Sequence, residues 1–152
     1  MALMIRSAAL YGFADLVRSS GGNVAQLLEE AGIPAEACDQ LDLKIPVAAY
    51  YRLFALASAR IENETIGLRL AQVRRLSLLG PLGLYVREQG TVRRFLGILL
   101  RYIWVHNEAV CALLNETSHA VTISIVLMRD RVAPTRDNVE VVVGPCASIC
   151  AR

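Results

Sequence analysis

The chain has 152 residues, with 16 basic and 14 acidic side chains and 55% hydrophobic residues. A chain of this length and composition can bury an ordinary apolar core without metals or disulfides, which excludes a disordered protein. The formal net charge of +2 is too small and too evenly spread for a nucleic-acid-binding surface built on charge alone. Composition therefore indicates one globular domain.

Membrane-spanning and secreted proteins do not fit the sequence. Its longest apolar runs, 95–100 and 102–105, are separated by Arg101, whereas a membrane-spanning helix needs about 20 consecutive apolar residues. Arg6 interrupts the first apolar stretch, and no cleavage site of small residues follows, so a secretory signal is not expected. We therefore expect a cytoplasmic protein with no membrane partner.

The four cysteines, Cys38, Cys111, Cys146 and Cys150, show neither CxxC nor Cys/His spacing. In a reducing compartment such cysteines are expected to be small buried hydrophobic side chains. The sequence therefore predicts no metal site and no cofactor.

The first half of the chain has the spacing of helices. Asn23 and Gln26 have the form of a capping box, and Gly32 stands where a helix ends in the left-handed conformation. Pro34 suits the first turn of a short helix. Apolar spacing and these punctuating residues predict helices over 5–17, 23–32, a short stretch after 34, 47–60 and 64–72.

The middle of the chain predicts two more helices, over 82–89 and 92–106. Thr91 is expected to cap the second of these. Nearly every position from 92 to 106 is apolar apart from three arginines and a glycine, so the polar stripe is narrow. We expect most of this helix to be buried in the core.

Alternating patterns after His106 predict two antiparallel strands, over about 110–114 and 121–128, with a turn at 115–119. A lone hairpin is only marginally stable in water, so it should pack on the 92–106 helix or on further strands. The fold class is therefore α+β, with an N-terminal helical bundle, a buried helix, and an antiparallel β-hairpin or small sheet.

The last residues fit this pattern poorly. The segment 137–143 suits a helix or a strand, but Gly144-Pro145 is expected to interrupt it, and 146–152 lacks an amphipathic pattern. We therefore expect a domain over 1–143 that is truncated at its C-terminus, followed by an atypical tail over 144–152.

The segment 23–42 has the rhythm of a helix–turn–helix, in which a second helix would enter the DNA major groove. Its charged residues are all acidic and would be repelled by phosphates: Glu29, Glu30, Glu36, Asp39 and Asp42. A packed helical pair is the favoured interpretation, and direct DNA binding through 23–42 is the alternative.

Arginine supplies all the basic residues except Lys44. Guanidinium groups match carboxylates and other anions in two-point contacts, so a cluster of them would form an anion site. Solvated helix faces are the other interpretation, favoured because these arginines are spread over four predicted elements: Arg69, Arg74, Arg75, Arg87, Arg93, Arg94 and Arg101.

Candidate binding residues are polar groups near apolar walls. His106-Asn107-Glu108 lies between the 92–106 helix and the first strand, where a helix C-cap and turn explain it better than catalysis, because no nucleophile–base or metal spacing is present. Aromatic side chains either belong to the core or line an apolar pocket. We expect no catalytic residues, and we take as candidate ligand-binding residues Tyr50, Tyr51, Arg75, Trp104, His106 and Asn107.

Five segments in this order and spacing resemble the N-terminal effector-binding, arabinose-binding-like domain of AraC-type bacterial transcription regulators. The resemblance runs from about residue 5 to about residue 142. The segments are GGNVAQLLEEAGIP at 21–34, KIPVAAYYRL at 44–53, IGLRL at 66–70, LGPLGL at 79–84 and HNE at 106–108.

The resemblance implies a sensor and dimerisation domain that binds a small-molecule effector and is not an enzyme. It implies homodimers, or heterodimers with intact relatives. In this family a separate C-terminal pair of helix–turn–helix motifs binds DNA, and we expect that part to be missing here. A truncated or frame-shifted regulator would have this form. The family supplies no residue-level site to carry over.

Overall fold

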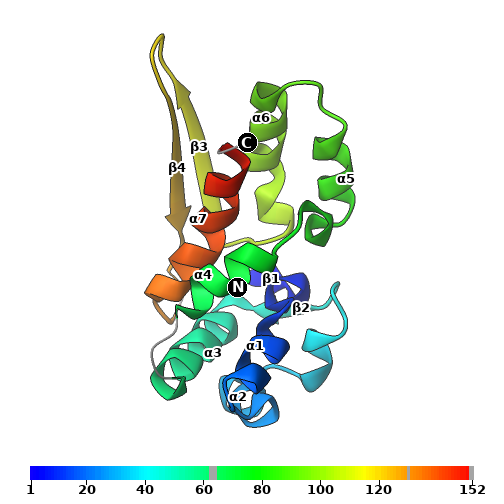
Figure 1. Ribbon diagram of the computed structural model, residues 1–152, viewed down its shortest axis with the longest axis vertical. Helices are drawn as coiled ribbons and strands as arrows, with labels where there is room; N and C mark the ends of the chain where they lie inside the picture. The colour runs from blue at the N-terminus through cyan, green and yellow to red at the C-terminus, as the bar shows by residue number, and fades with distance from the viewer. Residues whose placement is uncertain (62–64, 130, 151–152) are drawn as a thin grey trace.

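The computed structural model describes residues 1–61, 65–129 and 131–150, with side chains up to Pro145. Helices combine with two small antiparallel sheets, which confirms the α+β class (Figure 1). The regular elements are β1 (Met4–Arg6), α1 (Phe13–Ser19), α2 (Val24–Ala31), β2 (Lys44–Pro46), α3 (Val47–Arg60), α4 (Ile66–Val73), α5 (Pro81–Arg87), α6 (Val92–Tyr102), β3 (Val110–Glu116), β4 (Val121–Leu127) and α7 (Arg136–Cys150). The short 3₁₀ helices are η1 (Ser7–Leu10), η2 (Ala35–Cys38), η3 (Leu76–Leu79) and η4 (Ile103–Val105).

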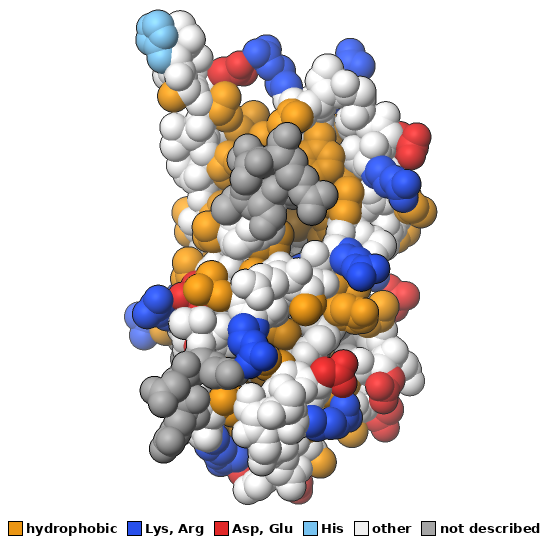
Figure 2. All heavy atoms as spheres, viewed as in Figure 1, with side chains coloured by type: hydrophobic (Ala, Val, Ile, Leu, Met, Phe, Trp, Pro, Cys, Tyr) orange, Lys and Arg blue, Asp and Glu red, His pale blue; other side chains and the backbone are white. Residues whose placement is uncertain are grey.

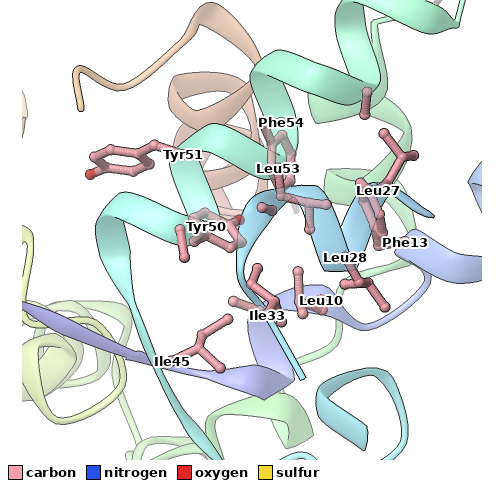
Figure 3. Close-up of a cluster of buried hydrophobic side chains, with 14 of the residues drawn as sticks. Leu10, Phe13, Leu27, Leu28, Ile33, Ile45, Tyr50, Tyr51, Leu53 and Phe54 are labelled. Carbon is pink, nitrogen blue, oxygen red and sulfur yellow. The ribbon is translucent and has the colours of Figure 1, made fainter. Parts of the chain in front are cut away.

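The main hydrophobic core lies among α1, α2 and α3, in the lower part of the view in Figure 1 (close-up in Figure 3). Phe54 of α3 lies at its centre, with its ring centroid 5.7 Å from that of Phe13 and 4.8 Å from that of Tyr50. Leu27 and Leu28 of α2 belong to the same cluster of buried side chains. The predicted helix over 47–60 is confirmed, because its apolar stripe is the part that packs here.

The predicted helix over 5–17 is wrong at its start. Ile5 belongs to β1, which pairs antiparallel with β2, so that Ile5 lies opposite Ile45. Both side chains are buried, at 2% and 1% exposed. A three-residue strand is too short to show alternation, and its hydrogen-bonding partner lies 40 positions away, so local spacing alone favours a helix.

The predicted helix caps are confirmed. The Asn23 side chain accepts a hydrogen bond from the Gln26 backbone N–H at 3.2 Å, and Gly32 ends α2 with a φ of 76°. At the start of α6, the Thr91 hydroxyl accepts from the Arg94 backbone N–H at 3.3 Å. These contacts satisfy donors that a helix N-terminus otherwise leaves free.

The predicted hairpin is also confirmed, with Ala112 opposite Ile125 and Leu114 opposite Ile123. These inner positions are half-buried, and β3 packs against α6 as expected. The outer face remains open, since Leu113 is 62% exposed. The hairpin therefore packs against the rest of the molecule with its inner face only.

The expected burial of the 92–106 helix is wrong. Within α6 only Leu96 and Leu99 are buried, and after Tyr102 the chain tightens into η4, where Trp104 is 56% exposed. The apolar side of α6 borders an open cavity instead of a packed core. A rule based on composition cannot distinguish these two environments.

Helix α7 crosses the point where an interruption was expected, so that expectation is wrong. Gly144 and Pro145 both lie within α7. Proline removes one helical hydrogen bond, but close packing against α4 compensates. A Cβ on Gly144 would lie 2.5 Å from Ala71 Cβ, and a Cβ on Gly67 would lie 2.3 Å from the carbonyl oxygen of Asp137. The two helices approach this closely only because both glycines lack a side chain.

Candidate functional site

A cavity of about 580 Å³ lies where α6, the hairpin, α7 and the end of α4 meet. Hydrophobic side chains gather on this part of the surface, between the hairpin and α6 (Figure 2). The volume falls within the range of about 300–1,000 Å³ that is typical of small-molecule sites. The apolar lining consists of Ile5, Ala71, Leu76, Leu78, Leu79, Phe95, Leu99, Leu100, Ile103, Val110, Ala112, Ile125, Val141, Val142 and Pro145.

The apolar walls follow from the periodicity of each element. On the α6 and η4 side, Phe95, Leu99 and Ile103 recur every four residues and so share one face. On the hairpin, Ala112 and Ile125 are a directly opposed pair on its inner face. Val141, Val142 and Pro145 bring α7 into the wall, so residue 145, in the expected tail, contributes to the cavity.

Polar groups come together at the start of the segment that follows α4. Arg74 donates from Nη2 to the Ala9 carbonyl at 2.7 Å and lies 3.5 Å from the Tyr50 hydroxyl. Its Nε is buried and finds no hydrogen-bond partner in the described part of the chain. Tyr50 is 3% exposed, and burial raises the pKa of its hydroxyl. This end of the cavity therefore presents a guanidinium beside a neutral phenol.

His106 lies beside the same group and is only 6% exposed. Burial, and then the nearby charges of Arg74, Arg6 and Lys44, lower its pKa to about 3. The imidazole is therefore neutral at pH 7, with Nδ1 3.5 Å from Arg6 Nη1. Burial is the main cause of this shift, and the three nearby cations act in the same direction.

Asn107 is held by the fold. Its backbone bridges to Ile5, and its side-chain Oδ1 accepts from the Ala109 backbone N–H at 2.9 Å. The preceding residue, His106, is the C-cap of η4, as the helix-cap interpretation predicted. Asn107 therefore presents its amide at a fixed position in the lining.

The structure brings together four of the six predicted ligand-binding residues. Tyr50, Arg75, His106 and Asn107 line the cavity, with Arg75 exposed at the surface. The sequence prediction omitted Arg74, although its neighbour Arg75 was included. Arg74 was named instead among the possible anion-site arginines, and the structure places both neighbours in the cavity lining.

Tyr51 and Trp104 do not line the cavity. Tyr51 leaves α3 in another direction from Tyr50, is 1% exposed, and burial raises its pKa to about 12 (Figure 3). Trp104 lies largely in solvent, on the outside of η4. Their inclusion among the predicted ligand-binding residues has no support in the cavity geometry.

The arginines predicted as a possible anion site do not gather as one group. Arg74 and Arg75 reach the cavity. Arg93 instead pairs with Glu116 of the hairpin, and Arg101 lies over the Tyr102 ring with 5.7 Å to its centroid. Of the seven arginines, only Arg74 and Arg75 are part of the described cavity lining.

The segment 23–42 is a packed helical structure. α2 buries Leu27 and Leu28 against α3, while η2, where a recognition helix would lie, has four residues. Glu30 on the exposed side of α2 pairs with Arg60 at 2.5 Å. Neither the length of η2 nor this surface charge suits a DNA groove.

Within 1–61, 65–129 and 131–145, no three histidine, cysteine or acidic side chains are placed to hold a metal ion. Cys38 and Cys111 are free thiols; Cys38 is half-buried, but Cys111 is exposed, so the expected burial is wrong for Cys111. Among the helices that the structure describes, none is long and apolar enough to cross a membrane.

Comparison with known proteins shows the family of the chain. Residues 21–152 match the family model described as the arabinose-binding N-terminal domain of AraC transcription regulators. The HTH-type transcriptional regulator VirS of Mycobacterium tuberculosis, in strains CDC 1551 / Oshkosh and ATCC 25618 / H37Rv, is 30% identical over 115 residues, or 76% of this chain. The chain spans about a third (34%) of the length of these curated relatives. The chain belongs to the family of arabinose-binding N-terminal domains of AraC transcription regulators.

Proposed function

We propose that this domain binds a small-molecule effector in the 580 Å³ cavity and acts as a regulatory domain, not as an enzyme. The observation that supports this proposal is the cavity itself, which has apolar walls and a few polar groups at one end. Such a lining is the usual design of a small-molecule site, because apolar walls provide affinity and a few polar groups fix orientation. Tyr50, Arg74, Arg75, His106 and Asn107 would supply those polar groups.

The composition of the lining supports binding over catalysis. In the described part of the chain, no serine, cysteine or carboxylate side chain lines the cavity. The histidine that does line it has a pKa of about 3, far below the range in which a general base works near pH 7. The described lining therefore provides contacts for a ligand but contains no nucleophile–base pair.

Helix α7 would transmit ligand binding to the rest of the regulator. It is fixed against α4 near Gly67 and forms a cavity wall near Pro145, so a ligand contacts a helix that also belongs to the core. A ligand that prefers one position of α7 shifts the population toward that position. In a regulator this shift would act on promoter binding in the cytoplasm.

Dimerisation is the second part of the proposal, either with a second copy or with an intact relative. The outer face of the hairpin supports it, since Leu113 and Val126 are 62% and 55% exposed. Light scattering of the purified chain should show a dimer, and Leu113→Glu should shift it to monomer. A monomer before the substitution contradicts this part of the proposal.

A small-molecule screen by thermal shift tests effector binding. A compound that raises Tm for the unaltered chain should lose its effect in Ala112→Phe, because the larger side chain fills the cavity from β3. Ala120→Phe is the matched control, the same substitution at an exposed position of the same hairpin that does not line the cavity. A compound whose effect survives Ala112→Phe does not bind in the cavity, and the proposal fails if every active compound behaves this way.

A further inference from the structure

The charge balance at Arg74 identifies a feature of the ligand. Two other arginines have acidic partners: the partly buried Arg6 pairs with Asp42, and the exposed Arg60 pairs with Glu30. Arg74 has no ion pair there, although its side chain is partly buried, and its Nε has no hydrogen-bond partner. A partly desolvated cation without an anion is costly unless something supplies the missing charge.

No carboxylate of the lining supplies that charge. The described lining contains arginine, histidine, asparagine, glutamine and tyrosine, but neither aspartate nor glutamate. His106 is neutral at pH 7, and Arg75 adds a second positive charge at the surface. The cavity therefore has a positive end and an otherwise apolar wall.

We propose that the ligand is an apolar carboxylic acid whose carboxylate lies against Arg74 and Tyr50 and whose hydrocarbon part fills the space between α6, the hairpin and α7. This inference rests on the proposed function, since it concerns the ligand of the same cavity. The guanidinium donates to one carboxylate oxygen. The Tyr50 oxygen faces Arg74 Nη2 at 3.5 Å, which leaves its O–H free to donate to the other.

The number of charges favours a carboxylate over a phosphate. Arg74 is a single, partly buried cation, and Arg75 is exposed to water. A carboxylate brings one negative charge, whereas a phosphate monoester brings about two at pH 7 and would leave one of them uncompensated in an apolar cavity. A neutral sugar or alcohol would leave Arg74 without its counter-charge.

Octanoate and octan-1-ol test this inference, because they share a hydrocarbon chain and differ in the charged group. Isothermal titration calorimetry of the purified chain should show octanoate binding about 10- to 100-fold more tightly, as expected for hydrogen bonds to a charged group. Arg74→Gln should lower octanoate affinity by about the same factor and leave that of octan-1-ol unchanged. Octyl phosphate should bind more weakly than octanoate.

Two further variants keep the test decisive if Arg74→Gln folds poorly after losing its bond to the Ala9 carbonyl. Tyr50→Phe keeps the core ring but removes the hydroxyl, so octanoate should bind several-fold more weakly. Arg101→Gln removes an exposed arginine outside the cavity and should leave binding unchanged. An equal loss of octanoate affinity in Arg101→Gln and Arg74→Gln would show that octanoate binds to surface charge, and would overturn the inference.

The outcomes separate this inference from the proposed function. Equal affinity for octanoate and octan-1-ol contradicts the inference that the ligand carries a carboxylate, and still supports effector binding. The inference of a carboxylate ligand is also contradicted if neither octanoate nor octan-1-ol binds, or if octyl phosphate binds more tightly than octanoate. The small-molecule screen with Ala112→Phe then decides independently whether the cavity binds any ligand.

Discussion

Gly67 provides a sharp test of how α4 and α7 pack. A Cβ built on Gly67 would lie 2.3 Å from the Asp137 carbonyl oxygen and 2.7 Å from its Cα. These are backbone atoms, so no side-chain rotation relieves the clash, and α7 must move away in Gly67→Ala. That movement also strains the hydrogen bond from the Gly67 backbone N–H to Asp137 Oδ1, which is 3.0 Å long.

Two opposing effects set the size of the change. Inserting a methyl group into a packed contact costs about 1–3 kcal/mol. Alanine gains at most about 1 kcal/mol over glycine in a helix interior, and less in the first turn, where Gly67 lies. Since the contact is far shorter than van der Waals distance, we expect the free energy of unfolding to fall by about 2 kcal/mol. For a chain of this size, that lowers Tm by about 4–8 °C.

Urea unfolding followed by circular dichroism measures this change. Gly97→Ala is the matched control, because Gly97 lies in α6 and a Cβ added there would meet no atom within 4 Å. It should raise the free energy of unfolding by about 0.5–1 kcal/mol, the helix preference of alanine alone. If Gly67→Ala stabilises the protein as Gly97→Ala does, then α7 does not pack on α4 as described.

Three further substitutions test other buried groups. Asp137→Ala removes the acceptor of hydrogen bonds from the Gly67 N–H and the Ser58 hydroxyl. It should lower the free energy of unfolding, measured in urea, by about 2 kcal/mol. An unchanged free energy of unfolding contradicts this role of Asp137. The pKa of His106 is about 3 in the folded chain, against 6.5 for the free side chain, so protonation of His106 favours the unfolded chain. The free energy of unfolding should therefore fall from pH 6.5 toward pH 3, by up to about 1.4 kcal/mol per pH unit. His106→Gln should flatten this slope and His119→Gln should not; equal slopes in both variants refute the assignment. Tyr51→Phe should keep or raise stability, because the Tyr51 hydroxyl is buried without a partner among the described residues; a loss above about 1 kcal/mol in a thermal melt refutes this.

Local sequence patterns predicted the elements whose stabilising contacts are local. The 47–60 helix, the hairpin and the Asn23 and Thr91 caps depend on spacing within a few residues, and all are confirmed. The β1–β2 pairing joins residues 40 positions apart. Nothing in the sequence around Ile5 indicates that partner, so its apolar spacing was interpreted as a helix.

The cavity was predictable only in part. Apolar positions on α6 look alike in sequence whether they pack in a core or face a cavity, so its burial was overestimated. Tyr50 and His106 were found because polar groups beside apolar runs attract attention. Arg74 stands among the seven possible anion-site arginines, but nothing in the sequence distinguishes it from the others, because its partial burial without an acidic partner exists only in three dimensions.

Methyl NMR of the chain with labelled isoleucine δ1 groups tests effector binding in the cavity directly, because isoleucines lie both at the cavity and away from it. The best binder from the small-molecule screen is titrated into the sample. We expect the signals of Ile5, Ile103 and Ile125 to shift together with one dissociation constant, while those of Ile33 and Ile61, which do not line the cavity, stay in place. Shifts confined to isoleucines that do not line the cavity, with those three unmoved, would contradict effector binding in this cavity.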